Sequence, residues 1–141
     1  MKKIVAFIFA ILLFVGCTAC AKQSPPVVYP TLDLYQLNDE LIMDFDKAKK
    51  DYEDEYFEIF VRIDYLIEKS QSFRATPVSK GYIEHMERAN AKILGTVQNA
   101  VDFYTLQTSK ETTFIIRGKI TDIAYNRDIY IQMDIYEVVE W

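Results

Sequence analysis

The chain has 141 residues, 50% of them hydrophobic and 26% charged, which suits a single folded domain and gives no sign of bulk disorder. Its formal net charge of −5 makes nucleic acid a poor partner, because a phosphate backbone is bound by neutralising it with cations. The ten tyrosines and nine phenylalanines favour strands, since these side chains fit half-buried pleated surfaces.

The N-terminus carries two lysines followed by an apolar run of 12 residues, positions 4–15. The run is shorter than the roughly 20 residues that span a bilayer, and it has the length of the apolar part of a secretory signal peptide. A buried core helix is the alternative interpretation. The end of this run and the two residues after it, Phe14-Val15-Gly16-Cys17, resemble a lipobox, in which the cysteine is lipidated and becomes the mature N-terminus. We therefore predict a lipoprotein signal peptide at residues 1–16 and lipidation of Cys17.

Two other interpretations of this segment stay open. Cys20 is the second candidate for the lipid anchor, and Ala19-Cys20-Ala21 also fits an ordinary signal-peptidase site. A redox, haem or zinc role for the two cysteines is not supported by the sequence. No strand precedes them, no histidine follows Cys20, and His85 is the one histidine available as a further ligand.

Residues 17–30 include three of the four prolines, so we expect a lipid-anchored, extended tether there and a folded domain at 31–141. The domain begins with apolar residues at helical spacing, which predicts one amphipathic helix up to residue 52. Its predicted inward side chains are Leu34, Leu37, Leu41, Phe45, Ala48 and Tyr52.

Alternation then predicts strands at residues 56–66, 73–78, 92–98, 101–107, 113–123 and 128–139, with a hairpin at 125–128 and a short helix at 81–90. In the first strand Phe57, Ile59, Val61, Ile63 and Tyr65 are expected to face inward. Gly118 inside a strand indicates a bend or bulge of the kind that closed barrels need. The predicted fold is mainly β (α+β), a small five-stranded OB-like barrel preceded by the helix and, before that, the signal peptide.

Several of these features together resemble the small bacterial lipoproteins of the tRNA_anti-like OB-fold family. The resemblance lies in the lipobox, in Ala48, Tyr52 and Tyr56 around the end of the helix, and in the segments Gly118-Lys119-Ile120 and Ile129-Tyr130-Ile131. It implies an OB fold and an extracytoplasmic location. The family name records a likeness of fold to nucleic-acid-binding domains, and fold alone does not define a function.

The sequence offers little that indicates catalysis. It contains no HExxH, G-x-S-x-G or P-loop motif. His85, beside Glu84 and Glu87, is expected to be a surface residue, with a catalytic role as the alternative. The acidic segment 44–55 lacks the glycine of a calcium loop and is expected to be a solvated helix face. We therefore expect no cofactor, no metal and no enzymatic activity, with a small hydrolase as the weakest hypothesis.

One group of side chains is a candidate ligand face. Aromatic and basic residues alternate with the apolar ones on the predicted strands, and such side chains hold oligosaccharides or single strands on OB folds. Ordinary cross-strand pairing, which contributes about 0.2–1 kcal/mol per pair, is the alternative explanation. The candidate residues are Phe60, Arg62, Arg117, Lys119, Tyr130 and Tyr136.

These observations lead to two hypotheses of function. The first is a lipoprotein anchored in the bacterial cell envelope, acting as a non-catalytic binding or envelope-interaction module whose partners are the membrane and an envelope protein or glycan. Several buried acyl chains would hold the domain there, since each CH₂ contributes about 0.8 kcal/mol. The second is an OB-fold domain that binds oligosaccharide or single-stranded nucleic acid, although the net charge counts against nucleic acid.

Overall fold

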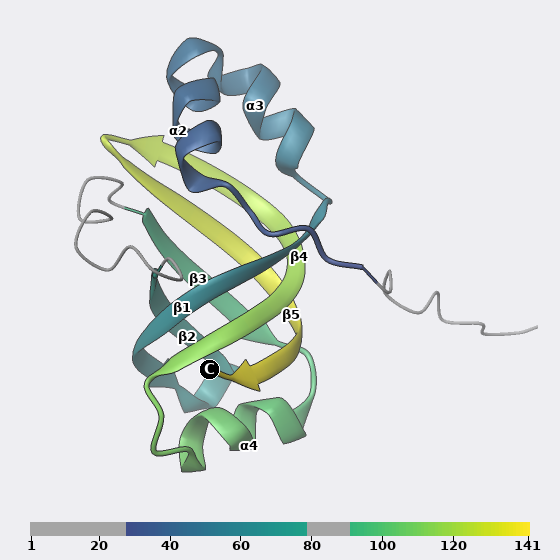
Figure 1. The fold of residues 1–141 in the computed structure, drawn as a ribbon, viewed down its shortest axis with the longest axis vertical. Helices are drawn as coiled ribbons and strands as arrows, with labels where there is room; N and C mark the ends of the chain where they lie inside the picture. The colour runs from purple at the N-terminus through teal and green to yellow at the C-terminus, as the bar shows by residue number, and fades with distance from the viewer. Residues whose placement is uncertain (1–27, 79–90) are drawn as a thin grey trace, which may run out of the picture.

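A computed structural model describes residues 28–78 and 91–141 (Figure 1). The predictions for Cys17, Cys20, His85 and the helix at 81–90 lie outside the described residues. In chain order the elements are α2 (Leu34–Met43), α3 (Phe45–Tyr52), β1 (Tyr56–Ile67), a 3-10 turn (Glu68–Ser70), β2 (Ser72–Pro77), β3 (Ala91–Val97), α4 (Ala100–Thr108), β4 (Thr113–Asn126) and β5 (Asp128–Glu140).

The strands form a closed barrel in the order β1-β2-β3-β5-β4. All neighbouring pairs are antiparallel except β3 and β5, which run parallel. A parallel pair needs a crossover connection, and here α4 and β4 together make it. The predicted fold class is confirmed: a mainly β, OB-like five-stranded barrel with helix preceding it (Figure 1).

The core follows the alternation of the strands, with helices closing the barrel ends. Alternate residues of β4 and β5 are buried, as period-two patterning requires. The helices α2 and α3 lie over one end of the barrel and α4 over the other (Figure 1). The largest fully buried side chains are Phe73, Phe114, Leu37, Ile93, Ile116, Ile120, Ile123, Ile129, Ile131, Met133, Ile135 and Val61.

The predicted single helix is two helices, because the chain leaves helical geometry at Asp44. This residue has φ −155° and ψ 94°, ends α2, and accepts a hydrogen bond from the Lys47 N–H as the N-cap of α3. Asp33 caps α2 in the same way. Four of the predicted inward residues are buried (Leu34, Leu37, Leu41 and Ala48), whereas the break turns Phe45 outward to 36% exposure.

The prediction that Tyr65 faces inward is wrong. Strand β1 carries a β-bulge between Ile63 and Tyr65 on its ladder with β2. A bulge inserts one residue and reverses the faces beyond it. Tyr65 is therefore 50% exposed, while Leu66 packs against the core.

The strand predicted at residues 101–107 is also wrong, since this segment forms α4. Val101 and Tyr104 point to solvent at 75% and 64% exposure, whereas Phe103 and Leu106 are buried at helical spacing. The Asn99 side chain starts the helix by accepting from the Asp102 N–H at 2.8 Å. The β-branched and aromatic residues here favour a strand locally, and packing against the barrel end overrides that preference.

Asn99→Ala is expected to lower the free energy of unfolding by about 1–2 kcal/mol, because it removes the N-cap of α4. The amide also donates to Asp102 Oδ2 and to the Tyr136 carbonyl, so it ties the helix to β5. Urea denaturation measures the change. Asn38→Ala, within α2, is the control, and a loss of the same size for both variants would contradict the capping role.

The bulge predicted at Gly118 and the hairpin predicted at residues 125–128 are both present. The β4–β5 ladder shifts register between Arg117 and Gly118, which is the expected bulge. Asn126 pairs with Asp128 around Arg127, whose φ of 63° is left-handed. The hairpin therefore turns at a single residue between the two long strands.

Candidate ligand-binding groove

The six residues of the sequence-predicted ligand face all lie on strands and alternate with buried neighbours, but they do not form one site. Tyr130 is near the start of β5, beside Lys92 of β3. The other five lie on the outer surface of β1, β4 and the second half of β5. Arg62 is exposed there, opposite Thr76 of β2 and Thr113 of β4.

Two of the three cations on the β1–β4–β5 surface, Arg117 and Lys119, are already paired, whereas Arg62 forms no ion pair within residues 28–78 and 91–141. The Arg117 guanidinium donates to Glu58 at 2.7 Å and to Glu137 at 2.9 Å. The hydrogen bond to Glu137, and then that to Glu58, raises the pKa of Arg117. Lys119 lies 3.2 Å from Asp54, and that contact raises the pKa of Lys119. Neither cation is free to meet an anionic ligand without breaking an ion pair.

The aromatic residues of the same surface pack on one another. The Tyr56 ring lies 6.1 Å from Tyr136 and 6.1 Å from Tyr29, centroid to centroid. Burial raises the pKa of Tyr136. Phe60 meets Trp141 edge to face at 5.3 Å. Aromatic contacts of this kind stabilise a fold, each contributing about 0.5–1.5 kcal/mol beyond the burial of the rings.

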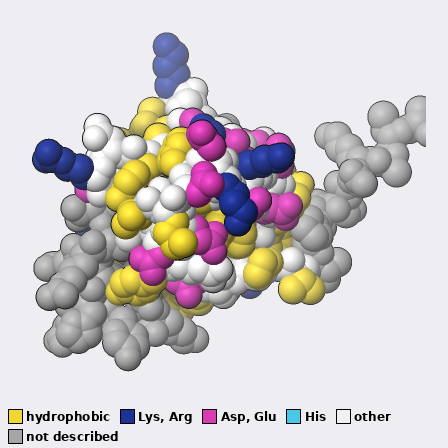
Figure 2. Space-filling view, turned by 90° about the horizontal axis from the view of Figure 1, so that it is seen from above, with side chains coloured by type: hydrophobic (Ala, Val, Ile, Leu, Met, Phe, Trp, Pro, Cys, Tyr) yellow, Lys and Arg dark blue, Asp and Glu magenta, His cyan; other side chains and the backbone are white. Residues whose placement is uncertain are grey.

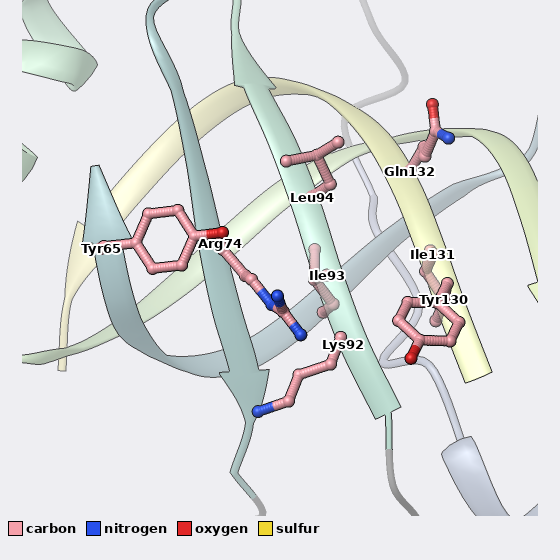
Figure 3. A pocket seen from close by; sticks show the side chains of 8 residues that line it. All are labelled: Tyr65, Arg74, Lys92, Ile93, Leu94, Tyr130, Ile131 and Gln132. Atoms are coloured by element: carbon pink, nitrogen blue, oxygen red, sulfur yellow. The ribbon is translucent and has the colours of Figure 1, made fainter. Parts of the chain in front are cut away.

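A groove of about 240 Å³ opens on a different part of the barrel (Figure 3). It crosses four strands along the ladder row Tyr65–Arg74–Leu94–Gln132, in which each residue pairs with the next. A second pair, Lys92 with Tyr130, lies alongside. Its lining residues are Tyr65, Arg74, Lys92, Ile93, Leu94, Tyr130, Ile131 and Gln132.

The groove has an aromatic ring at each side and cations between them. Figure 3 shows Tyr65 and Tyr130 on opposite sides, with Arg74 and Lys92 reaching into the space between. The two rings are 50% and 41% exposed. The bulge in β1 is what brings Tyr65 here, because without it the ring would point into the barrel.

The electrostatics of the groove differ from those of the whole chain. Two cationic residues and no acidic residue stand among the described lining residues, in a chain of net charge −5. Lys92 lies 3.4 Å from Asp64 and also donates to Thr76, so its charge is partly compensated. Arg74 forms no ion pair within residues 28–78 and 91–141, and its hydrogen bond with the Tyr65 hydroxyl raises the pKa of Arg74.

Metal-ligating side chains do not cluster in the described part of the chain. Across 28–78 and 91–141, no cluster of three or more His, Cys, Asp or Glu could hold a metal ion. The groove lining contributes hydrogen-bond donors, rings and an amide, which suit recognition of a ligand. No helix in the described part of the chain combines the length and apolar character needed to cross a membrane.

Sequence reasoning found Tyr130 of this groove and missed Tyr65, Arg74, Lys92, Leu94 and Gln132. A usable signal lies in β2 and β3, where Arg74 alternates with buried Phe73 and Ala75, and Lys92 with buried Ala91 and Ile93. That alternation indicates outward cations on two strands. The register that aligns them with β5, and the bulge that turns Tyr65, are properties of the folded barrel.

The barrel belongs to the class of OB-like domains by its strand order, its parallel β3–β5 pair and the α4 connection. Comparison with known family models, curated proteins and solved structures found no match to this chain. The resemblance to tRNA_anti-like lipoproteins therefore stays a prediction. The groove is the feature of the structure that bears on function.

Proposed function

We propose that the protein is a non-catalytic ligand-binding module, held on the outer side of a bacterial membrane by a lipid on Cys17, and that its groove binds an oligosaccharide bearing acidic groups. One observation carries the choice of ligand. Arg74 lies between two exposed tyrosine rings, with no acidic residue among the described lining residues. Flat rings suit the faces of sugar units, and a guanidinium suits a carboxylate.

The alternative ligand is single-stranded nucleic acid, which OB folds also bind in a groove of this kind. Stacking on Tyr65 and Tyr130 is compatible with bases. A phosphate backbone, however, needs several cations along its path, and the groove combines Arg74 with a Lys92 that already meets Asp64. The chain's net charge of −5 repels both anionic ligands, but a strand with one phosphate per nucleotide meets more of this repulsion than a short oligosaccharide with only a few carboxylates.

Arg74→Gln is expected to weaken the binding of an oligogalacturonate probe about tenfold or more, because a hydrogen bond to a charged group contributes about 1.5–3 kcal/mol. Isothermal titration calorimetry at low and moderate salt measures the change. Arg117→Gln is the matched control, since that side chain is engaged by Glu58 and Glu137 outside the groove.

Two results of this titration would contradict the proposal. One is equal weakening by both arginine variants, which would indicate a general effect of positive charge rather than a site in the groove. The other is tight binding of a short oligothymidylate together with no binding of oligogalacturonate. Binding of oligothymidylate that is lost steeply with salt would then support the nucleic-acid alternative.

Cys17→Ser is expected to move the protein from the membrane fraction to the soluble fraction of a bacterial host. The acyl chains on Cys17 would otherwise contribute about 0.8 kcal/mol for each buried CH₂. Mass spectrometry of the mature wild-type chain checks the same point, with a diacylglyceryl mass on Cys17 as the expected result. Cys20→Ser is the control, and a mature chain that begins at Lys22 without lipid would overturn the anchor.

A further inference from the structure

The helices α2 and α3 expose more apolar side chain than a solvated helix pair requires. Ile42 is 61% exposed and Met43 85%, both in the last turn of α2. Phe45, at the start of α3, is 36% exposed, and Tyr35, two turns before Ile42, is 50% exposed. These four residues of two neighbouring helices are the apolar patch, and exposed apolar side chains grouped in this way indicate an interaction surface.

The segment that contains these helices, with the turn that follows them, carries the negative charge of the molecule. Between positions 33 and 55 the chain has nine Asp or Glu and three Lys, a formal charge of −6, compared with −5 for the whole sequence. The rest of the chain is therefore close to neutral. Figure 2 looks down on this end of the molecule and shows acidic side chains interleaved with hydrophobic ones.

A hollow of about 230 Å³ lies beside the patch, where α2 meets α3. Met43 forms part of its wall, and buried Ala48 also lines it. Three carboxylates stand around it, from Glu40, Asp44 and Asp51, and the single cation is Lys47, 3.8 Å from Asp51. The lining thus has a net negative charge, with room for an apolar or cationic side chain of a partner.

We propose that the apolar patch and this hollow form a protein-docking surface whose partner is a basic amphipathic segment, with apolar side chains flanked by lysine or arginine. Apolar burial supplies affinity, and charge complementarity supplies orientation and rate. A membrane surface is the less suitable occupant, because the segment 33–55, with a formal charge of −6, is repelled by anionic lipid headgroups. The surface shares no residue with the groove, so it is a second site.

The test uses the full chain and a fluorescent synthetic peptide of leucine and lysine in amphipathic helical order. The double variant Ile42→Ser/Met43→Ser is expected to raise the Kd for this peptide about tenfold or more, from the lost apolar burial. Glu40→Gln/Asp51→Asn, which neutralises two of the carboxylates around the hollow, is expected to raise the Kd less, with an effect that shrinks as salt is added. Val101→Ser is the matched control, because that side chain is equally apolar and 75% exposed on α4.

Three results would overturn the proposal. The first is a Kd that Val101→Ser raises as much as the double variant does. The second is equal binding of a peptide in which glutamate replaces every lysine. The third is binding of the wild-type chain to phosphatidylcholine vesicles that the double variant abolishes, with no change in peptide binding; this would assign the patch to lipid.

Discussion

Gly118→Ala is expected to lower the free energy of unfolding by about 3 kcal/mol or more, at the upper end of the range for overpacking. A Cβ on Gly118 would sit 3.0 Å from the Asp134 carbonyl carbon and 3.1 Å from the Ile135 Cα, and closer still to the carbonyl oxygen. These are backbone atoms of β5, paired with β4 over most of its length. The clash is therefore relieved only by separating the two strands that close the barrel.

Urea denaturation with a circular-dichroism readout measures this loss. Thr121→Ala, an exposed change on the same strand, is the control and is expected to stay within about 0.5 kcal/mol of wild type. If Gly118→Ala were as stable as wild type, the bulge between Arg117 and Gly118 would not bring the strands as close as described.

Phe73→Ala is expected to cost about 3–5 kcal/mol, because the ring is fully buried at the centre of the barrel. Phe73 pairs with Gly95 across β2 and β3, and its ring covers the glycine. Removing the ring leaves a cavity, and the strands of a closed barrel cannot readily move inward to fill it. Phe45→Ala is the matched control and is expected to cost much less, since that ring is 36% exposed.

A double-mutant cycle tests the contact between ring and glycine directly. A Cβ on Gly95 would lie 2.6 Å from Phe73 Cε1, so Gly95→Ala alone must displace the ring. In a Phe73→Leu background the same Gly95→Ala change is expected to cost less than half as much. Additive losses would contradict the packing of the ring over the glycine.

Local pattern was sufficient to predict most of the barrel. The strands β1, β2, β3, β4 and β5 were found from alternation, because each has one face buried and one exposed. The failures have two causes, a local helix cap in one case and a tertiary contact that overrides local preference in the other. Asp44 breaks a continuous helical pattern by capping, and α4 is helical despite strand-forming residues because Phe103 and Leu106 pack under the barrel.

The groove could be predicted less well than the fold. Its residues come from four strands, and their alignment depends on ladder registers that no single segment encodes. The sequence also does not show which cations are held in ion pairs. Arg117 and Arg74 look alike in the chain, yet Arg117 is held by Glu58 and Glu137, whereas Arg74 lies beside Tyr65 in the groove.

The most direct test of the central claim is an NMR titration of the isotope-labelled chain with oligogalacturonate, following the backbone amide shifts. We expect the largest shifts at the strand residues of the groove, with saturation and loss of the shifts in Arg74→Gln. The amides around Arg117 and Lys119 are expected to stay in place. Shifts centred on those two residues, or none at any concentration of the probe, would contradict the assignment of the groove as the ligand-binding site. The groove residues to follow are Tyr65, Arg74, Lys92, Leu94, Tyr130 and Gln132.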